Sequence, residues 1–225
     1  MKKLILTNAR LWDPKNESLT IQNILLINGK VMGVGYLPED EDKTGEVLEL
    51  AGQFIVPNIV NIIESPFTIH TKGPDSEIDI ITQELKMLAS EGAGRRHFFP
   101  ITLKESLVLI DQARKEGFAV TCGTDPCFFY PTNTLRADAE ALVEGIKKGI
   151  VEVVASTDMD AALPLLIKKL HHEEKMELKD IFKLITSYPQ HLFGLKMPLV
   201  ALMQSPNLTV IDLKKGKELP KVTYV

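Results

Sequence analysis

Residues 96–122, RHFFPITLKESLVLIDQARKEGFAVTC, decide the fold class, because they contain a strand, a helix and a second strand in succession. His97–Phe99 is a short apolar run, and Leu103–Glu116 has apolar residues at helical spacing. Gly117 marks the end of that helix, and Phe118–Cys122 is the next strand. A strand, a helix and a strand in this order predict parallel strands joined by a helical crossover.

The same alternation continues on both sides of this segment. Phe54–Ile63 is almost continuously apolar, as expected for a strand that is buried on both faces, and Ile150–Ala155 is rich in β-branched residues. Helical spacing of apolar residues predicts further helices over residues 77–91, 137–148, 161–170 and 178–187. The middle of the chain is therefore expected to be an α/β domain.

Both ends of the chain have the pattern of β-structure. The first 55 residues contain short apolar runs separated by turn formers, and Asn28-Gly29 predicts a hairpin because both residues tolerate positive φ. Leu208–Asp212 predicts one strand near the other end. We expect residues 1–55 and 196–225 to form one small β-sandwich domain, and residues 56–195 to form the α/β domain inserted in it.

Composition excludes several classes of protein. The 225 residues are 44% hydrophobic with a net charge of −4, and the short basic runs are flanked by acids, so no nucleic-acid surface is expected. Two cysteines do not form a disulfide framework. No apolar run approaches the ~18 residues of a membrane helix, and no signal peptide is visible. These features predict a cytoplasmic protein with reduced thiols.

The order of segments resembles the amidohydrolase superfamily, and its dihydroorotase branch in particular. The segments that carry the resemblance are the opening Leu6–Pro14, the stretches Val56–Ser65 and Pro74–Ser106, the segment Phe118–Phe129, and the helix Leu184–Leu195 with Thr186 and Pro189. This resemblance implies a (β/α)₈ barrel with a small β domain made from the two ends of the chain. It also implies a zinc-dependent hydrolase acting on a cyclic amide.

The chain departs from that family at the positions that would hold the metal. Such ligands must be imidazole or carboxylate groups. The family's aspartate and two histidines of the first motif fall on Asn61, Ile63 and Ser65, and a further ligand histidine falls on Pro100. We therefore expect no metal cofactor.

A block of the barrel is also missing. A (β/α)₈ barrel usually needs ~200–250 residues, and the shortening falls between Ser65 and Pro74, where the family places its second to fifth strands. The expected architecture is α/β, with about half of a TIM-type barrel and about four barrel strands, namely the first strand 54–63 and those at 97–99, 118–122 and 150–155.

A rebuilt site remains an alternative at this stage. Asp158 could serve as ligand and general base if a one-residue slip is allowed, since the family's aspartate otherwise falls on Thr157. His97 and His70 could be further ligands, and Arg136 retains a substrate-binding position of the family. The competing interpretation of Asp158 is a helix cap, which Asp favours. Cys122 and Cys127 could form a metal pair, although a core thiol is the simpler interpretation of Cys122.

These observations predict a catalytically inactive dihydroorotase-like protein with a structural or regulatory role linked to pyrimidine biosynthesis. Silent chains of this family associate with aspartate carbamoyltransferase, so the resemblance implies that enzyme as a partner. The alternatives are a divergent metal-dependent dihydroorotase with a rebuilt site, and a small-molecule binding module. Open strand edges and apolar strands further predict a homodimer, in which the two open sheets cover each other, or an obligate complex.

Overall fold

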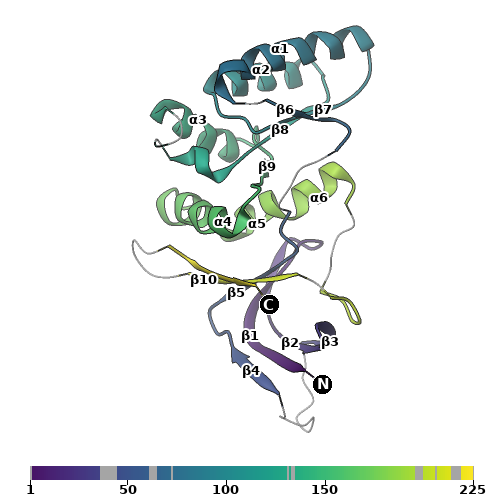
Figure 1. Cartoon of the computed structure of the whole chain (residues 1–225), viewed down its shortest axis with the longest axis vertical. Coiled ribbons are helices and arrows are strands. Elements are labelled where there is room, and N and C mark those ends of the chain that lie inside the picture. The colour runs from purple at the N-terminus through teal and green to yellow at the C-terminus, as the bar shows by residue number, and fades with distance from the viewer. Residues whose placement is uncertain are drawn as a thin grey trace. The chain divides into compact units, whose positions relative to one another are not determined.

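The computed structural model describes residues 2–35, 45–60, 65–71, 73–130, 132, 135–195, 200–205, 207–213 and 219–224. The chain forms two compact units, one of residues 1–59 with 175–225 and the other of residues 60–174 (Figure 1). Within the described residues, no helix has the length and apolar character to cross a membrane.

The first unit is built on one seven-stranded sheet. Its strand order is β11-β10-β5-β1-β2-β3, and β4 pairs with β1. The strands are β1 (Lys3–Asp13), β2 (Ser18–Ile27), β3 (Lys30–Val34), β4 (Glu46–Glu49), β5 (Phe54–Pro57), β10 (Leu208–Asp212) and β11 (Lys221–Tyr224). The predicted hairpin is confirmed, since Asn28 and Gly29 join β2 to β3 with φ values of 51° and 75°.

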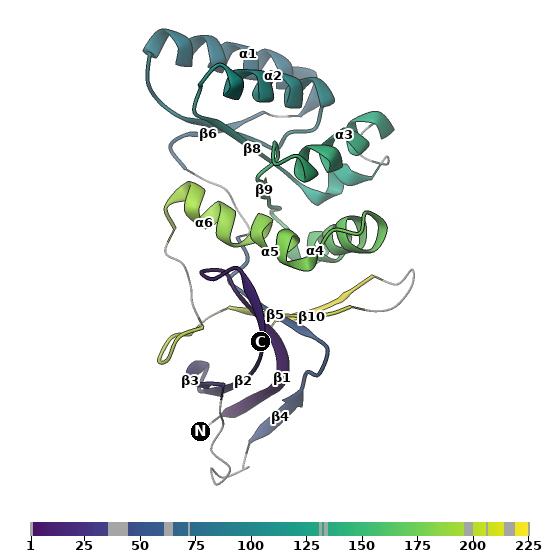
Figure 2. The ribbon, with the colours of Figure 1, turned by 180° about the vertical axis from the view of Figure 1, so that it is seen from behind.

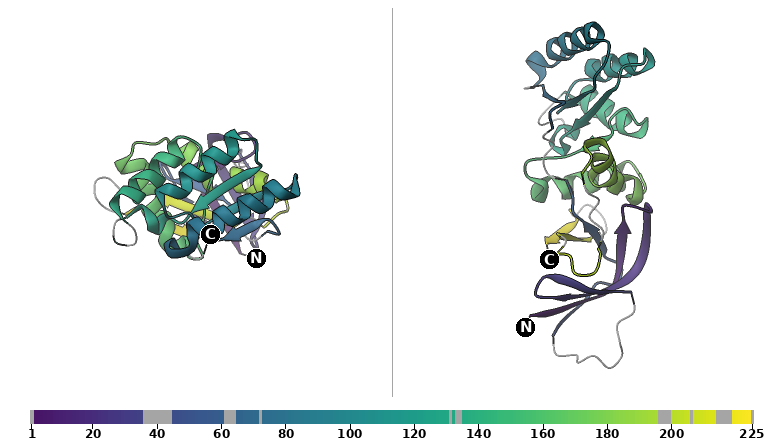
Figure 3. Two further views of the ribbon diagram at one scale, coloured as in Figure 1. Left: turned by 90° about the horizontal axis from the view of Figure 1, so that it is seen from above. Right: turned by 90° about the vertical axis from the view of Figure 1, so that its right-hand side faces the viewer.

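A bulge separates the part of β1 that pairs with β4 from the part that pairs with β5. The register with β2 shifts between Leu6 and Ala9, and Asn8 has a φ of 56°. The Glu49 carboxylate holds the bulge, accepting hydrogen bonds from Thr7 Oγ1 at 2.8 Å and Asn8 Nδ2 at 3.1 Å, and the bond from Thr7 lowers the pKa of Glu49. The strands that were expected to form a β-sandwich form one continuous hydrogen-bonded sheet in the described residues. This sheet is curved (Figure 3).

The two ends of the chain meet in this sheet, as predicted. β10 pairs antiparallel with β5, with Val210 opposite Ile55 and Ile211 opposite Phe54. The assignment of Phe54–Ile63 to the barrel is therefore wrong for its first part. The four residues of β5 are buried on both faces, as the apolar run indicated, but their neighbours are β1 and β10.

Two helices also belong to the first unit: α5 (Leu178–Ile185) and α6 (Ser187–Phe193). Phe182 packs on Trp12 with ring centroids 5.8 Å apart, and Trp12 Nε1 donates a hydrogen bond to Thr186 Oγ1 at 3.0 Å. The division therefore falls at residue 174, whereas the sequence placed it at 195, because a buried aromatic cluster holds these helices to the sheet.

The second unit has a four-stranded parallel sheet in the order β6-β7-β8-β9. Its strands are β6 (Thr68–His70), β7 (Arg96–Phe99), β8 (Val120–Thr124) and β9 (Val153–Val154). The helices are α1 (Pro74–Glu91), α2 (Lys104–Lys115), α3 (Arg136–Lys147), α4 (Met159–Ile167), the 3₁₀-helix η1 (Pro126–Phe129) and the π-helix η2 (Lys168–Glu173). The parallel crossovers were predicted correctly.

Strand β6 was not predicted, because it lies in the shortened stretch between Ser65 and Pro74, where no strand was expected. It contributes three residues, whose pairing with β7 places Thr68 opposite His97 and His70 opposite Phe99. Helices α1 and α2 lie side by side next to this sheet (Figure 2), and Ile81, Phe98 and Ile110 are fully buried.

Candidate functional site

The carboxyl ends of the four parallel strands are the first place to look for a site, because α/β proteins place their ligands there. A buried hydroxyl ends or follows each strand of this sheet. They are Thr71 after β6, Thr102 after β7, Thr124 in β8 and Ser156 after β9, and none is more than 7% exposed.

These hydroxyls are engaged within the protein. Thr71 Oγ1 donates to the carbonyl of Pro100, and Thr124 Oγ1 donates to the carbonyl of Ile101 at 2.6 Å. Ser156 Oγ accepts a bond from the backbone N–H of Asp158 at 3.2 Å. The bonds of Thr71 and Thr124 join the ends of neighbouring strands, and the bond of Ser156 is local to its own loop. These polar groups thus have a structural use at the edge where a catalytic site would need them.

Two carboxylates from neighbouring helices hold the beginning of α2. Glu77 of α1 is fully buried and accepts bonds from the backbone N–H groups of Thr102 and Leu103 at 3.0 and 3.1 Å. Asp138 of α3 accepts a bond from the N–H of Lys104 at 2.9 Å. A helix N-terminus is a ready site for an anion, and here the chain's own carboxylates fill it.

His97 lies inside the sheet and not at its carboxyl edge. Its side chain is buried, and Nδ1 is 2.9 Å from Thr121 Oγ1 on the neighbouring strand. Burial lowers the pKa of His97 to about 3, and the positive charges of Arg114, Arg95 and His70 add to the effect. The imidazole is therefore neutral at physiological pH and acts as part of the core.

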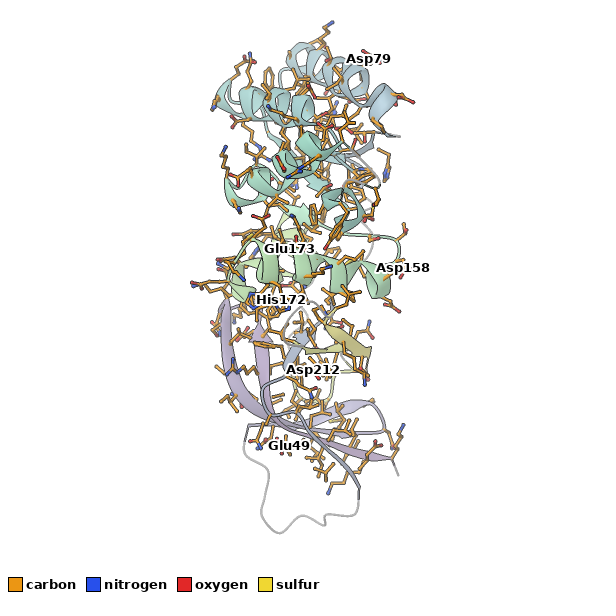
Figure 4. All side chains as sticks on the ribbon, turned by 90° about the vertical axis from the view of Figure 1, so that its left-hand side faces the viewer. Glu49, Asp79, Asp158, His172, Glu173 and Asp212 are labelled. Carbon is orange, nitrogen blue, oxygen red and sulfur yellow. The ribbon has the colours of Figure 1, made fainter. Side chains whose placement is uncertain are left out.

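The other candidate residues lie on separate elements. His70 is exposed on β6 and Asp158 is exposed after β9, and these strands form opposite edges of the sheet. Three strand spacings of ~4.8 Å separate the two edges by about 14 Å. Asp158 caps α4, accepting a bond from the N–H of Ala161 at 3.1 Å (Figure 4), so the cap interpretation is confirmed. Arg136 pairs with Glu140 on the surface of α3.

Two of the four substituted ligand positions, Asn61 and Ile63, lie outside the described residues. Ser65 bonds through its hydroxyl to Thr68 Oγ1 at 2.8 Å, and Pro100 offers its carbonyl to Thr71. Among the residues that the structure describes, no three histidine, cysteine or acidic side chains gather where they could hold a metal ion. The expectation of no cofactor stays a prediction.

The two cysteines do not make a thiolate pair. Cys122 is buried in β8 and donates to the carbonyl of Ile150, and burial raises the pKa of its thiol to about 12. Burial also raises the pKa of Cys127 to about 12, with Asp125 beside it adding to the shift. Because metals bind the thiolate form, both side chains are poor ligands, and Cys122 is the core thiol that the sequence suggested.

The open faces of the parallel sheet are less apolar than the sequence suggested. The exposed large apolar residues of the described segments include none from β6, β7, β8 or β9. The half-buried or exposed residues of these strands are mostly polar: Thr68, His70, Arg96 and Thr121, with Ile69 and Phe99 as the apolar ones. A homodimer formed through these faces stays a prediction, and the distribution of exposed apolar residues gives it no support.

The sequence is similar to curated dihydroorotases. It is 25% identical over 189 residues to the dihydroorotase of Caldicellulosiruptor saccharolyticus, covering 67% of this chain and 44% of that protein. It is 26% identical over 177 residues to the dihydroorotase of Bacillus licheniformis, covering 62% and 41% respectively. The chain therefore spans less than half the length of these relatives. No family model matches the sequence.

The fold is similar to that of dihydropyrimidinases and hydantoinases of known structure. The dihydropyrimidinase of Brevibacillus agri matches 93% of this chain and 86% of its own, with a TM-score of 0.71 and 9% identity. The L-hydantoinase of Arthrobacter aurescens matches 95% and 87%, with a TM-score of 0.67 and 13% identity. The mixed α/β architecture of this chain is thus similar to that of these two enzymes.

Proposed function

We propose that this chain, whose sequence is similar to dihydroorotases, is a catalytically silent member of the amidohydrolase superfamily, a subunit with a structural or regulatory role in pyrimidine biosynthesis in the cytoplasm. The observation that carries this proposal is the carboxyl edge of the parallel sheet. Hydroxyl groups there donate hydrogen bonds to carbonyls at neighbouring strand ends, and the carboxylates of Glu77 and Asp138 accept hydrogen bonds from backbone N–H groups.

The positions of individual residues support the same proposal. Metal-dependent hydrolases use the ion to lower the pKa of a bound water, which requires ligands converging on one point. Pro100 has no side-chain donor, Asp158 caps a helix, and His97 is buried inside the sheet, away from its carboxyl edge. We propose that the four parallel strands are the remnant of a barrel shortened between Ser65 and Pro74, and that this remnant now serves as a scaffold.

The proposed partner is aspartate carbamoyltransferase, the enzyme of the preceding step of the pathway. In some members of the family, silent dihydroorotase-like chains associate with this enzyme. A chain without its own site could act by holding that enzyme in an assembled state. The alternative is a divergent dihydroorotase with a rebuilt site. It rests on Asp158, which is exposed at the carboxyl end of β9 where a family aspartate is expected.

An assay of dihydroorotate hydrolysis and of the reverse ring closure, with zinc supplied, separates the two. We expect no rate above background for the wild-type chain. The Asp158→Ala variant should lose about 1 kcal/mol of stability through the lost cap and change no activity. An activity that persists through repurification and is abolished by Asp158→Ala would establish the alternative.

A further inference from the structure

The turn between β2 and β3 contains a chemically reactive pair of residues. Asn28 is followed by Gly29, the only asparagine–glycine step in the sequence, and both residues are exposed. Their φ values of 51° and 75° place both residues in the left-handed region that a two-residue hairpin turn requires. Water therefore reaches both the side-chain amide of Asn28 and the backbone nitrogen that follows it.

The backbone nitrogen of Gly29 is able to act as a nucleophile towards that amide. Among the described residues, no acceptor takes a hydrogen bond from the Gly29 N–H. A Cβ added at Gly29 would meet no atom within 4 Å, so there is open space around this residue. Glycine also has the widest freedom of backbone rotation. The nitrogen thus meets no steric barrier from its surroundings as it approaches Cγ of Asn28.

The side-chain carbonyl of Asn28 is held by a residue that is distant in the sequence. The backbone N–H of Lys2 donates to Asn28 Oδ1 at 3.0 Å, and the carbonyl of Lys2 accepts from the N–H of Asn28 at 2.8 Å. When a nucleophile adds to Cγ, negative charge develops on Oδ1. A backbone donor that already points at this oxygen stabilises the charge, as the N–H groups of an oxyanion hole do.

We propose that Asn28 is a site of spontaneous deamidation, which the backbone N–H of Lys2 assists. Gly29 N loses its proton to hydroxide and forms a bond to Asn28 Cγ, the Cγ–Nδ2 bond breaks, and ammonia leaves with a proton from water. The product of this step is a succinimide ring. Water then opens the ring at Cγ to give aspartate, or at the backbone carbonyl carbon to give isoaspartate. One water is consumed and one ammonia is released, without oxidation or reduction.

The modification changes the hairpin in two ways. Either product replaces a neutral amide by a carboxylate at a turn that neighbours Lys2 and Lys30. Isoaspartate also adds a methylene group to the backbone inside the turn, and the turn geometry sets the register of β2 against β3. The reaction needs no catalytic activity of the chain, so it is independent of the proposed function.

The test is incubation of the full folded chain at mildly alkaline pH, followed by digestion and mass spectrometry, which detects the exchange of an amide NH₂ for a hydroxyl group. Lys2→Pro removes the N–H donor, and proline is tolerated there because Lys2 is exposed and precedes the first residue of β1. Lys2→Ala is the matched control, since it removes the same side chain and keeps the N–H. Circular dichroism checks that both variants are folded.

We expect Asn28 to convert to aspartate and isoaspartate faster than any other asparagine of the folded wild type. Lys2→Pro should slow this conversion about fivefold, the worth of one hydrogen bond, and Lys2→Ala should react as wild type. In urea, where residues 2 and 28 are no longer in contact, all three chains should react alike.

Two kinds of result would overturn the proposal. Asn28 that stays intact in the wild type, or converts no faster than the other asparagines, would remove the site. A folded Lys2→Pro chain that reacts as fast as wild type, an equal slowing in Lys2→Ala, or a difference that persists in urea would remove the assistance by the Lys2 N–H.

Discussion

Replacing Glu77 by glutamine is expected to lower the free energy of unfolding by about 3 kcal/mol. The carboxylate accepts bonds from the N–H groups of Thr102 and Leu103 and from the Thr102 hydroxyl, all in a fully buried setting. A glutamine of the same shape turns an NH₂ group toward these donors. Leaving buried N–H groups without acceptors costs more than an average hydrogen bond contributes.

The measurement is urea denaturation followed by circular dichroism at the helical band. Asp79→Asn is the control, because Asp79 is an exposed acid on the same helix (Figure 4), and its replacement should change stability by less than about 0.5 kcal/mol. If Glu77→Gln proved as mild as Asp79→Asn, the carboxylate would not be holding the start of α2.

The second large effect is a loss of stability in mild acid that depends on His97. Burial lowers the pKa of this histidine to about 3 in the folded chain, against an ordinary value near 6.5. Between these two values the unfolded chain binds a proton at His97 and the folded chain does not. The free energy of unfolding should therefore fall as the pH is lowered from about 6.5 to about 3, by up to about 1.4 kcal/mol for each pH unit.

His97→Gln removes this titration while an amide can still bond the Thr121 hydroxyl. The difference between wild type and variant in denaturation curves at several pH values isolates the contribution of His97. The variant should show the shallower pH dependence below 6.5, and His191→Gln, at an exposed position on α6, should follow the wild type. Parallel curves for wild type and His97→Gln, or an imidazole NMR titration of His97 near 6.5, would contradict the buried neutral state.

Local signals in the sequence were sufficient for the helices of the second unit. Residues 77–91, 103–116 and 137–148 were expected, and α1, α2 and α3 agree with these ranges to within three residues at each end. Glycines end the runs for a physical reason: Gly92, Gly117 and Gly149 have φ values of 69°, 93° and 70°, which other residues rarely adopt.

Predictions that depend on contacts between residues far apart in the sequence were wrong. The apolar run that begins at Phe54 correctly predicted a buried strand, but it did not predict which sheet β5 joins. A strand between β1 and β10 has the same apolar pattern as a strand in a barrel. Strand β6 has three residues and offers no pattern to detect. The helices α5 and α6 were periodic, but only the packing of Phe182 on Trp12, far away in the sequence, assigns them to the first unit.

The candidate site shows the same limit. The cap formed by Asp158 could be predicted, since Asp at a helix start is a local signal. The bonds from Glu77 to Thr102 and from Asp138 to Lys104 could not, because they join residues 25 and 34 positions apart on different helices. Likewise, His97 could be named from the sequence as a candidate ligand, but its burial beside Thr121 follows only from the register of β7 and β8.

We predict that this chain does not hold a catalytic metal. Elemental analysis of the purified full chain, after incubation with zinc and removal of loosely bound ions, tests it directly and independently of any activity. We predict far less than one zinc, manganese or iron per chain. About one tightly bound transition metal per chain, lost together with Asp158→Ala or His70→Ala, would contradict the account and support a rebuilt hydrolase site.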